Sequence, residues 1–91
     1  MYQIKPYSYN QAKRLNVIIK PSTRKNKKID VFDKNNNFIT SIGDIKYKDY
    51  PTYLLINKNL ADERRRLYKI RHKQDKDVIG SAGYYANLIL W

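Results

Sequence analysis

The stretch KIDVFDKNNNFITSI, residues 28–42, carries the clearest fold signal in this sequence. Apolar and polar residues alternate over 28–32, and a second apolar run begins at Phe38. Between the two runs lies DKNNN, whose Asp and Asn side chains tolerate a positive φ and bond their own backbone. The stretch therefore predicts a β-hairpin with strands over 28–32 and 38–42.

The residues before the hairpin predict a third strand and a helix. Val17–Ile19 is a short β-branched run of the kind that favours a buried strand. An isolated hairpin is only marginally stable in water, so a third strand or a packed helix has to support it. Ser8 and Gln11 match a capping box, which predicts a helix over 9–15 that ends at Asn16.

The residues after the hairpin predict three helices. Pro51 at a first helical position indicates a short helix over 52–56. Asn59 is the expected N-cap of a longer helix that continues to Asp77. Ser81 is expected to cap a last, nearly uncharged helix whose apolar side chains fill the core.

Length and composition set the class of protein. A chain of 91 residues forms one domain with a modest core. The sequence therefore predicts a single basic α+β domain over 1–91, with a small antiparallel sheet of about three strands, a central hairpin over 28–42, and C-terminal helices packed on the sheet. There is no cysteine, which excludes disulfides and thiolate metal sites. No apolar run approaches the length of a membrane span or of a secretory signal.

The strongest functional signal is charge. Nineteen Lys and Arg against eight Asp and Glu give a formal net charge of +11, which indicates a polyanionic partner. The predicted helix over 59–77 holds a dense cationic run with no acid between Arg64 and Gln74. Leu60, Leu67 and Ile70 recur at helical spacing and are expected to dock this helix. The side chains expected to form its nucleic-acid-binding face are Arg64, Arg65, Arg66, Lys69, Arg71, His72 and Lys73. A solvated face that only keeps the protein in solution is the alternative.

A second cationic cluster lies in the polar segment STRKNKK, residues 22–28. The segment has no apolar residue to anchor it, so we expect a mobile arm that follows phosphates. The side chains assigned to this arm are Arg24, Lys25, Lys27 and Lys28. One extended polyanion accounts for two separate clusters, whereas a solvated loop is the simpler alternative.

Tyr47, Tyr50 and Tyr53 recur every third residue around Pro51. We expect them to pack the short helix against the sheet with their hydroxyls at the surface. Stacking on nucleic-acid bases is the less favoured alternative. A single-strand platform alternates aromatic and basic residues, and the spacing of these three tyrosines does not indicate such a platform.

Catalysis is not expected. One His and no paired metal-ligand spacing argue against a metal centre, and no cofactor motif is present. A nuclease would need two or three convergent carboxylates to hold a metal ion. Each acid has a simpler role, however, because Asp30 and Asp33 flank the hairpin turn and Asp62 and Glu63 lie near a helix start.

Several motifs resemble a known group of proteins. They are YKDYPTY over 47–53, RRRLYKIRH over 64–72, and GSAGYYA over 80–86 followed by ILW at 89–91, with KPS at 20–22 before the Lys-rich turn. Together they resemble a family of small basic proteins from large DNA viruses of algae and amoebae, of the chlorovirus and mimivirus kind. The resemblance carries over no functional residues. It implies a viral setting in which such proteins accompany the packaged genome.

These observations predict a non-catalytic protein that binds nucleic acid largely without sequence specificity, and the expected ligand is double-stranded DNA rather than RNA. The expected mechanism is neutralisation of phosphates with release of counterions. The expected location is the virion or the host cytoplasm or nucleus, without secretion. One alternative is a minor virion or scaffold protein whose basic face binds acidic protein surfaces, and a small nuclease is less favoured.

Overall fold

The computed structural model of this chain describes residues 1–91 and contains a three-stranded sheet and four helices. In chain order the elements are α1 (Pro6–Leu15), β1 (Ile18–Pro21), β2 (Lys27–Phe32), β3 (Phe38–Asp44), α2 (Tyr50–Leu54), α3 (Lys58–Arg71) and α4 (Ala82–Ile89). The α+β class with a small antiparallel sheet is confirmed. None of the four helices combines the length and the apolar character that crossing a bilayer requires.

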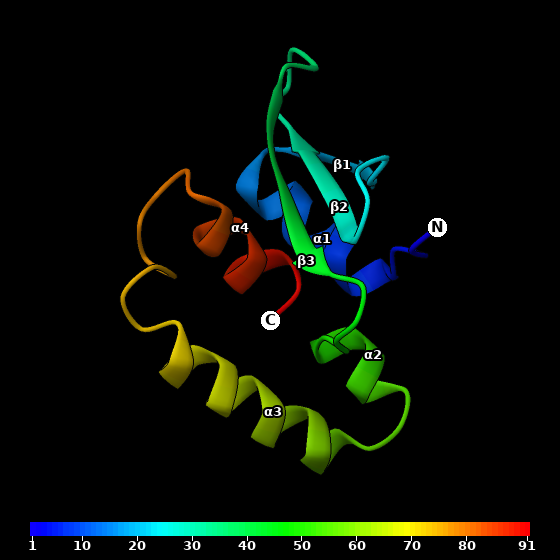
Figure 1. Cartoon of the computed structure of the whole chain (residues 1–91), viewed down its shortest axis with the longest axis vertical. Helices are drawn as coiled ribbons and strands as arrows, with labels where there is room; N and C mark the ends of the chain where they lie inside the picture. Colours follow the sequence, from blue (N-terminus) through cyan, green and yellow to red (C-terminus); the bar gives the residue numbers. More distant parts are fainter.

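The sheet has the antiparallel order β1-β2-β3, so β2 is the central strand (Figure 1). Ile19 pairs with Val31 across β1 and β2, and Ile29 pairs with Ile42 across β2 and β3. In the hairpin turn, the Asp33 carboxylate accepts hydrogen bonds from the backbone N–H groups of Asn35 and Asn37. Asn36, between them, adopts a φ of 67°. The predicted hairpin is confirmed, because Asn and Asp supply the turn geometry locally. A third strand is also present, at Ile18–Pro21 instead of the predicted 17–19.

The core lies between the sheet and two helices, α1 and α4. Its buried side chains come from the segment before α1, from α1, from all three strands and from the C-terminal end of α4. They are Ile4, Ala12, Ile19, Ile29, Val31, Ile42, Ile89 and Leu90. Both C-terminal helices were expected to pack on the sheet. α4 does so, with α1 beside it, but the expectation is wrong for α3, which lies farther from the sheet, against α2 (Figure 1). The Ser81 hydroxyl accepts a hydrogen bond from the Tyr84 N–H, which confirms the predicted cap of α4.

The capping box predicted at Ser8 and Gln11 is wrong. α1 begins at Pro6, and its N-cap residue provides no side-chain bond. The Ser8 hydroxyl donates instead to the Ile89 carbonyl at 2.8 Å, and the Gln11 amide donates to the Leu88 carbonyl at 2.9 Å. Both side chains therefore join α1 to α4, and a tertiary contact has overridden the local motif. The predicted end of the helix is confirmed, because Asn16 has a left-handed φ of 61°.

The limits of α3 also differ from the prediction. The helix begins at Lys58, where the Asn57 side chain accepts a hydrogen bond from the Leu60 N–H at 3.1 Å. Asn59 therefore lies in the first turn and is not the cap. The helix ends at Arg71, because His72 leaves the helical conformation and the residues up to Asp77 form turns. α2 is likewise displaced from the predicted 52–56, since the Asp49 side chain caps it from one residue before its start.

The face by which α3 docks is different from the one expected. Its buried residues are Ala61 and Tyr68, whereas Leu60, Leu67 and Ile70 are exposed, with Ile70 at 59%. Apolar spacing identified a stripe correctly, but the stripe remains exposed and does not dock the helix on the fold. α3 packs on α2, and its Tyr68 ring stacks on the C-terminal Trp91, so a large aromatic ring, rather than the aliphatic stripe, faces the fold.

The position of the α3 cap gives a testable difference between two neighbouring Asn residues. Asn57→Ala is expected to lower the free energy of unfolding by about 0.5–2 kcal/mol, because the Leu60 N–H loses its acceptor. Urea unfolding followed by far-UV circular dichroism measures this loss. Asn59→Ala is the matched control, and a larger loss for this variant than for Asn57→Ala would contradict the observed cap.

Candidate nucleic-acid interface

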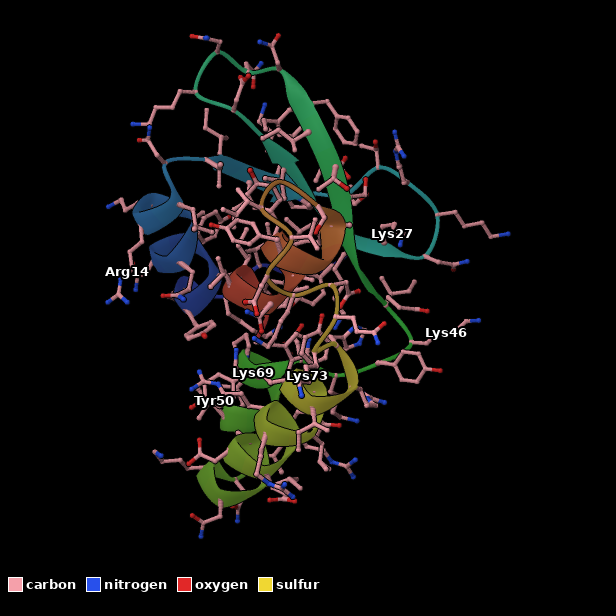
Figure 2. The ribbon with its side chains drawn as sticks, turned by 90° about the vertical axis from the view of Figure 1, so that its left-hand side faces the viewer. Arg14, Lys27, Lys46, Tyr50, Lys69 and Lys73 are labelled. Atoms are coloured by element: carbon pink, nitrogen blue, oxygen red, sulfur yellow. The ribbon has the colours of Figure 1, made fainter.

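The Lys and Arg side chains are spread over several sides of the molecule (Figure 2). Arg14 on α1 projects on one side of this view, and Lys27 and Lys46 project on the opposite side. The cationic side chains of α3 also point in different directions, because consecutive residues of a helix point about 100° apart. α3 therefore does not present its cations on the single positive face expected from the sequence.

Arg65 joins helices rather than projecting into solvent. Its guanidinium lies 3.4 Å from the centroid of the Tyr50 ring, and one of its amino groups donates to the Tyr7 hydroxyl at 3.1 Å. The Arg65 Nε is buried without a hydrogen-bond partner. Arg65 thus holds α3 against α2 and α1. The run RRR over 64–66 does not by itself indicate which of the three Arg residues has this role.

Other predicted contacts on α3 also have partners within the fold. The Lys69 ammonium donates to the Asn87 Oδ1 at 2.7 Å, and burial, with Arg65 and Lys76 nearby, lowers the pKa of Lys69. The exposed Arg66 pairs with Glu63 at 2.6 Å. Arg64, Arg71 and Lys73 make no ion pair and are exposed.

Lys28 is not the exposed loop residue that the sequence predicted. It is only 4% exposed, and its ammonium lies 2.9 Å from the fully buried Asp49 carboxylate, which also accepts the Tyr2 hydroxyl at 2.6 Å. Burial raises the pKa of Asp49, but hydrogen bonds from Thr52, Tyr2 and Lys28 outweigh it, so that pKa lies below its ordinary value. Lys28 is therefore withdrawn as a phosphate contact, because its ammonium is buried in an ion pair with Asp49.

The rest of the basic segment is anchored by polar contacts, although no apolar residue holds it. The Ser22 hydroxyl donates to Asp30 at 2.6 Å, and the Arg24 N–H donates back to the Ser22 hydroxyl at 3.0 Å. The expectation of an unanchored arm is therefore wrong. Arg24, Lys25 and Lys27 remain exposed, and the Arg24 guanidinium lies 4.6 Å from the Phe38 ring centroid.

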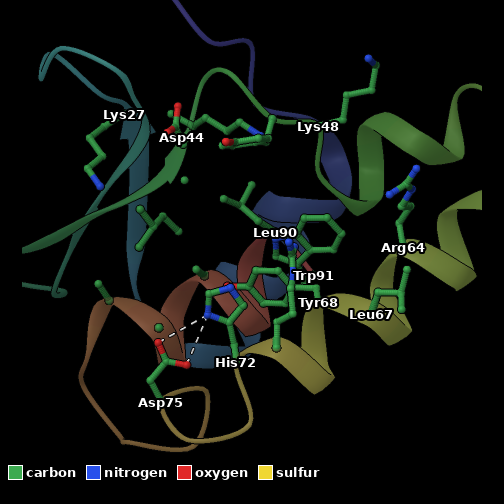
Figure 3. Close-up of a pocket in the computed structure, with 18 of the residues that line it drawn as sticks. Lys27, Asp44, Lys48, Arg64, Leu67, Tyr68, His72, Asp75, Leu90 and Trp91 are labelled. Atoms are coloured by element: carbon green, nitrogen blue, oxygen red, sulfur yellow. Dashed lines mark hydrogen bonds and ion pairs between the residues drawn. The ribbon is translucent and has the colours of Figure 1, made fainter.

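A groove of about 1110 Å³ brings several cations together (Figure 3). It lies between β3, the segment that follows β3, α3 and α4. Lys27 and Lys48 reach it from the sheet side, and Arg64 and Arg71 reach it from α3. None of these four side chains takes part in an ion pair. Its acidic lining residues are Asp44 and Asp75, so positive charge dominates this surface.

Aromatic rings form one wall of the groove. The Trp91 and Tyr68 rings stack with centroids 4.4 Å apart and an angle of 8°, and the His72 ring stacks on the other side of Tyr68 at 4.2 Å. The Asp75 carboxylate lies 3.4 Å from the His72 Nδ1. The groove therefore combines free cations with a continuous aromatic stack, which are the two features that nucleotides contact in proteins.

Sequence reasoning missed part of this site. Lys48 was not selected, and neither Tyr68 nor Trp91 was assigned to a binding surface. One signal was available, because Lys46-Tyr47-Lys48 does alternate basic and aromatic residues, and Tyr47 is 70% exposed. Of the three tyrosines, only Tyr50 is buried, and its hydroxyl donates to Asp62 at 3.1 Å. Nothing in the local sequence indicates that Trp91 meets Tyr68.

The acids have structural partners. Asp30 accepts hydrogen bonds from the Ser22 and Ser41 hydroxyls, each at 2.6 Å. Burial raises the pKa of Asp30, but these bonds and the Thr23 N–H outweigh it and lower the net pKa. No three His, Asp or Glu side chains lie close enough together to hold a metal ion.

The chain matches no protein-family model, and no curated protein or solved structure is similar enough to it to count as a match.

Proposed function

We propose that this protein binds nucleic acid non-catalytically and largely without sequence specificity, through phosphate contacts at the groove between the sheet and α3. One observation carries the proposal. Four cations without acidic partners, which come from β2, from the segment after β3 and from α3, converge on one groove. A fold that only needed charge for solubility gains nothing from this convergence, since like charges repel in the compact state.

The mechanism is electrostatic. The groove is lined by Lys27, Lys48, Arg64 and Arg71, which displace condensed counterions when they neutralise phosphates. The Arg guanidinium suits two-pronged contact with phosphate oxygens. Arg24 and Lys25, beside Lys27, extend the cationic surface beyond the groove. The resemblance to proteins of large DNA viruses favours DNA over RNA and a genome- or virion-associated role.

The proposal is tested by binding of a labelled random-sequence 20-mer, as a single strand and as a duplex, across a salt series. We expect log K to fall linearly with log salt, by about 0.9 per duplex phosphate and about 0.7 per single-strand phosphate. With Arg64→Ala and Arg71→Ala together, the slope is expected to become less steep by about 1.4–1.8, because two contacts are lost. Fluorescence anisotropy measures the binding constant K for the single strand and for the duplex at each salt concentration.

The matched control removes the same charge from the same helix outside the groove. Arg66→Ala and Lys73→Ala together change the net charge equally, but neither residue lines the groove. A weaker effect is expected for this pair, and equal effects of the two pairs would contradict the groove as the site. An oligonucleotide incubated with Mg²⁺ is expected to stay intact, and metal-dependent cleavage would contradict the non-catalytic assignment.

A second candidate, binding to an acidic protein surface as a minor virion or scaffold protein, is favoured by the corner between α2 and α3. Leu55 and Ile56 are 76% and 59% exposed there, beside the cation Lys58. Exposed aliphatic side chains rimmed by charge are typical of protein contacts. Co-purification with a capsid protein after nuclease treatment, lost in Leu55→Ser with Ile56→Ser, would support this candidate.

A further inference from the structure

We infer that the groove binds a single strand rather than a duplex, and that one unpaired base stacks on the open side of His72. The inference rests on the proposed function and specifies its ligand. A duplex carries its phosphates outside and its bases inside, so it cannot bring a base into a groove. A single strand exposes both, and its bases stack on aromatic side chains while cations follow its backbone.

The groove has the layout that a single strand requires. Figure 3 shows Lys27 on one side of the open space and Lys48 and Arg64 on the other side, with the labelled Tyr68 and Trp91 rings between these two sides. The cations therefore form rims for a phosphate backbone. The surface between the rims is largely apolar and includes Leu90 and Trp91. A nucleotide in this position places its phosphates near the cations and its base against His72, which borders the same groove.

The ring stack has one closed end and one open end. Tyr53 packs at a tilt against Trp91, with centroids 6.4 Å apart, and Tyr68 covers the other side of the Trp91 ring. Tyr68 is in turn covered by Trp91 and by His72, and it is buried. His72 is therefore the last ring. Its side chain remains 37% exposed and borders the groove.

The neighbours of His72 hold its ring in place. Asp75 lies 3.4 Å from the Nδ1 at the ring edge, and Tyr68 lies against one ring face at an interplanar angle of 25°. Gly83 makes room for this arrangement, because a Cβ there would lie 2.9 Å from the Asp75 carboxylate. A ring fixed by its edge and one face loses little freedom when a base covers the other face, which favours stacking.

The experiment compares a thymidine 20-mer, a uridine 20-mer, a 20-mer of abasic sites and a 20-base-pair duplex at matched salt. The abasic strand keeps the phosphates and lacks the bases. Wild-type protein is expected to bind the thymidine strand about tenfold more tightly than the abasic strand. Trp91 is the only Trp, so its fluorescence is expected to change when a base-bearing strand enters the groove. The uridine strand establishes whether RNA serves equally.

His72→Ala is expected to reduce the difference between thymidine and abasic strands to about twofold or less, whereas His72→Phe keeps it because Phe also stacks. Lys73→Ala, an exposed neighbour outside the groove, is expected to weaken all strands alike. Equal binding of thymidine and abasic strands by the wild type overturns the stacking inference while phosphate binding stands. Duplex binding as tight as single-strand binding also overturns it. Absence of binding to every probe at about 100 mM salt overturns the proposed function itself.

Discussion

Asp49→Asn is expected to lower the free energy of unfolding by about 3–5 kcal/mol, because it leaves the Lys28 ammonium charged and buried without its partner. A domain of this length is stabilised by about 5–14 kcal/mol in total. The substitution retains the shape of the side chain and a capping oxygen, so it isolates the loss of charge. Urea unfolding monitored by Trp91 fluorescence measures the change.

The same pair makes stability depend on pH. The pKa of Asp49 in the folded protein lies below its ordinary value. The ionised carboxylate therefore stabilises the fold above the unfolded-state pKa, and this stabilisation is lost as the pH falls through the lower, folded-state pKa. The difference in unfolding free energy between wild type and Asp49→Asn is expected to shrink as the pH is lowered from about 5.

Two controls separate the buried pair from charge in general. Glu63→Gln removes the partner of Arg66 in an exposed pair, and little change in the unfolding midpoint is expected because solvent screens that pair. Lys28→Met combined with Asp49→Asn is expected to recover much of the loss, because no unpaired charge remains buried. A double variant as unstable as Asp49→Asn alone would mean that the lost charge pair is not the cause.

Ile89→Ala is expected to lower the free energy of unfolding by about 2–5 kcal/mol, which is the second large effect. Ile89 is fully buried in the core between α1, α4 and the sheet. Truncation removes apolar contacts and leaves a cavity that the neighbouring helices fill only in part. Urea unfolding of the variant measures the loss, with an unchanged dependence on denaturant expected for a native-like fold.

Ile79→Ala is the matched control, since it makes the same chemical change at a position that is 84% exposed. Its effect is expected to stay within about 0.5 kcal/mol. Similar losses for the two variants would contradict the placement of α4 in the core. The comparison tests the tertiary structure directly, because both residues lie in the apolar C-terminal part of the sequence.

Local features were predicted from the sequence because their causes are local. The DKNNN turn supplies its own hydrogen bonds, so the hairpin follows from neighbouring residues. Asn16 and Ser81 act on backbone groups within a few residues, and both predicted roles are confirmed. Asn57 was missed in favour of Asn59, because two Asn residues two positions apart give the same local signal.

The candidate site was only partly predictable. Arg64, Arg71 and Lys27 were identified by charge and do line the groove. Charge alone did not separate them from Arg65, Lys69 and Lys28, which have partners inside the fold. A side chain is free for a ligand only if the folded protein leaves it unpartnered, and that depends on residues far away in the chain.

The sequence by itself determined the strands of the hairpin, the third strand, the helix caps at Asn16 and Ser81 and the large positive charge, since each depends on composition or on residues a few positions apart. Only the tertiary structure decided which side of α3 docks, which cations remain free and where the groove lies. The physical reason is that these features arise from contacts between distant residues. Tyr68 meets Trp91, Lys28 meets Asp49, and Ser8 bonds a carbonyl 81 positions along the chain.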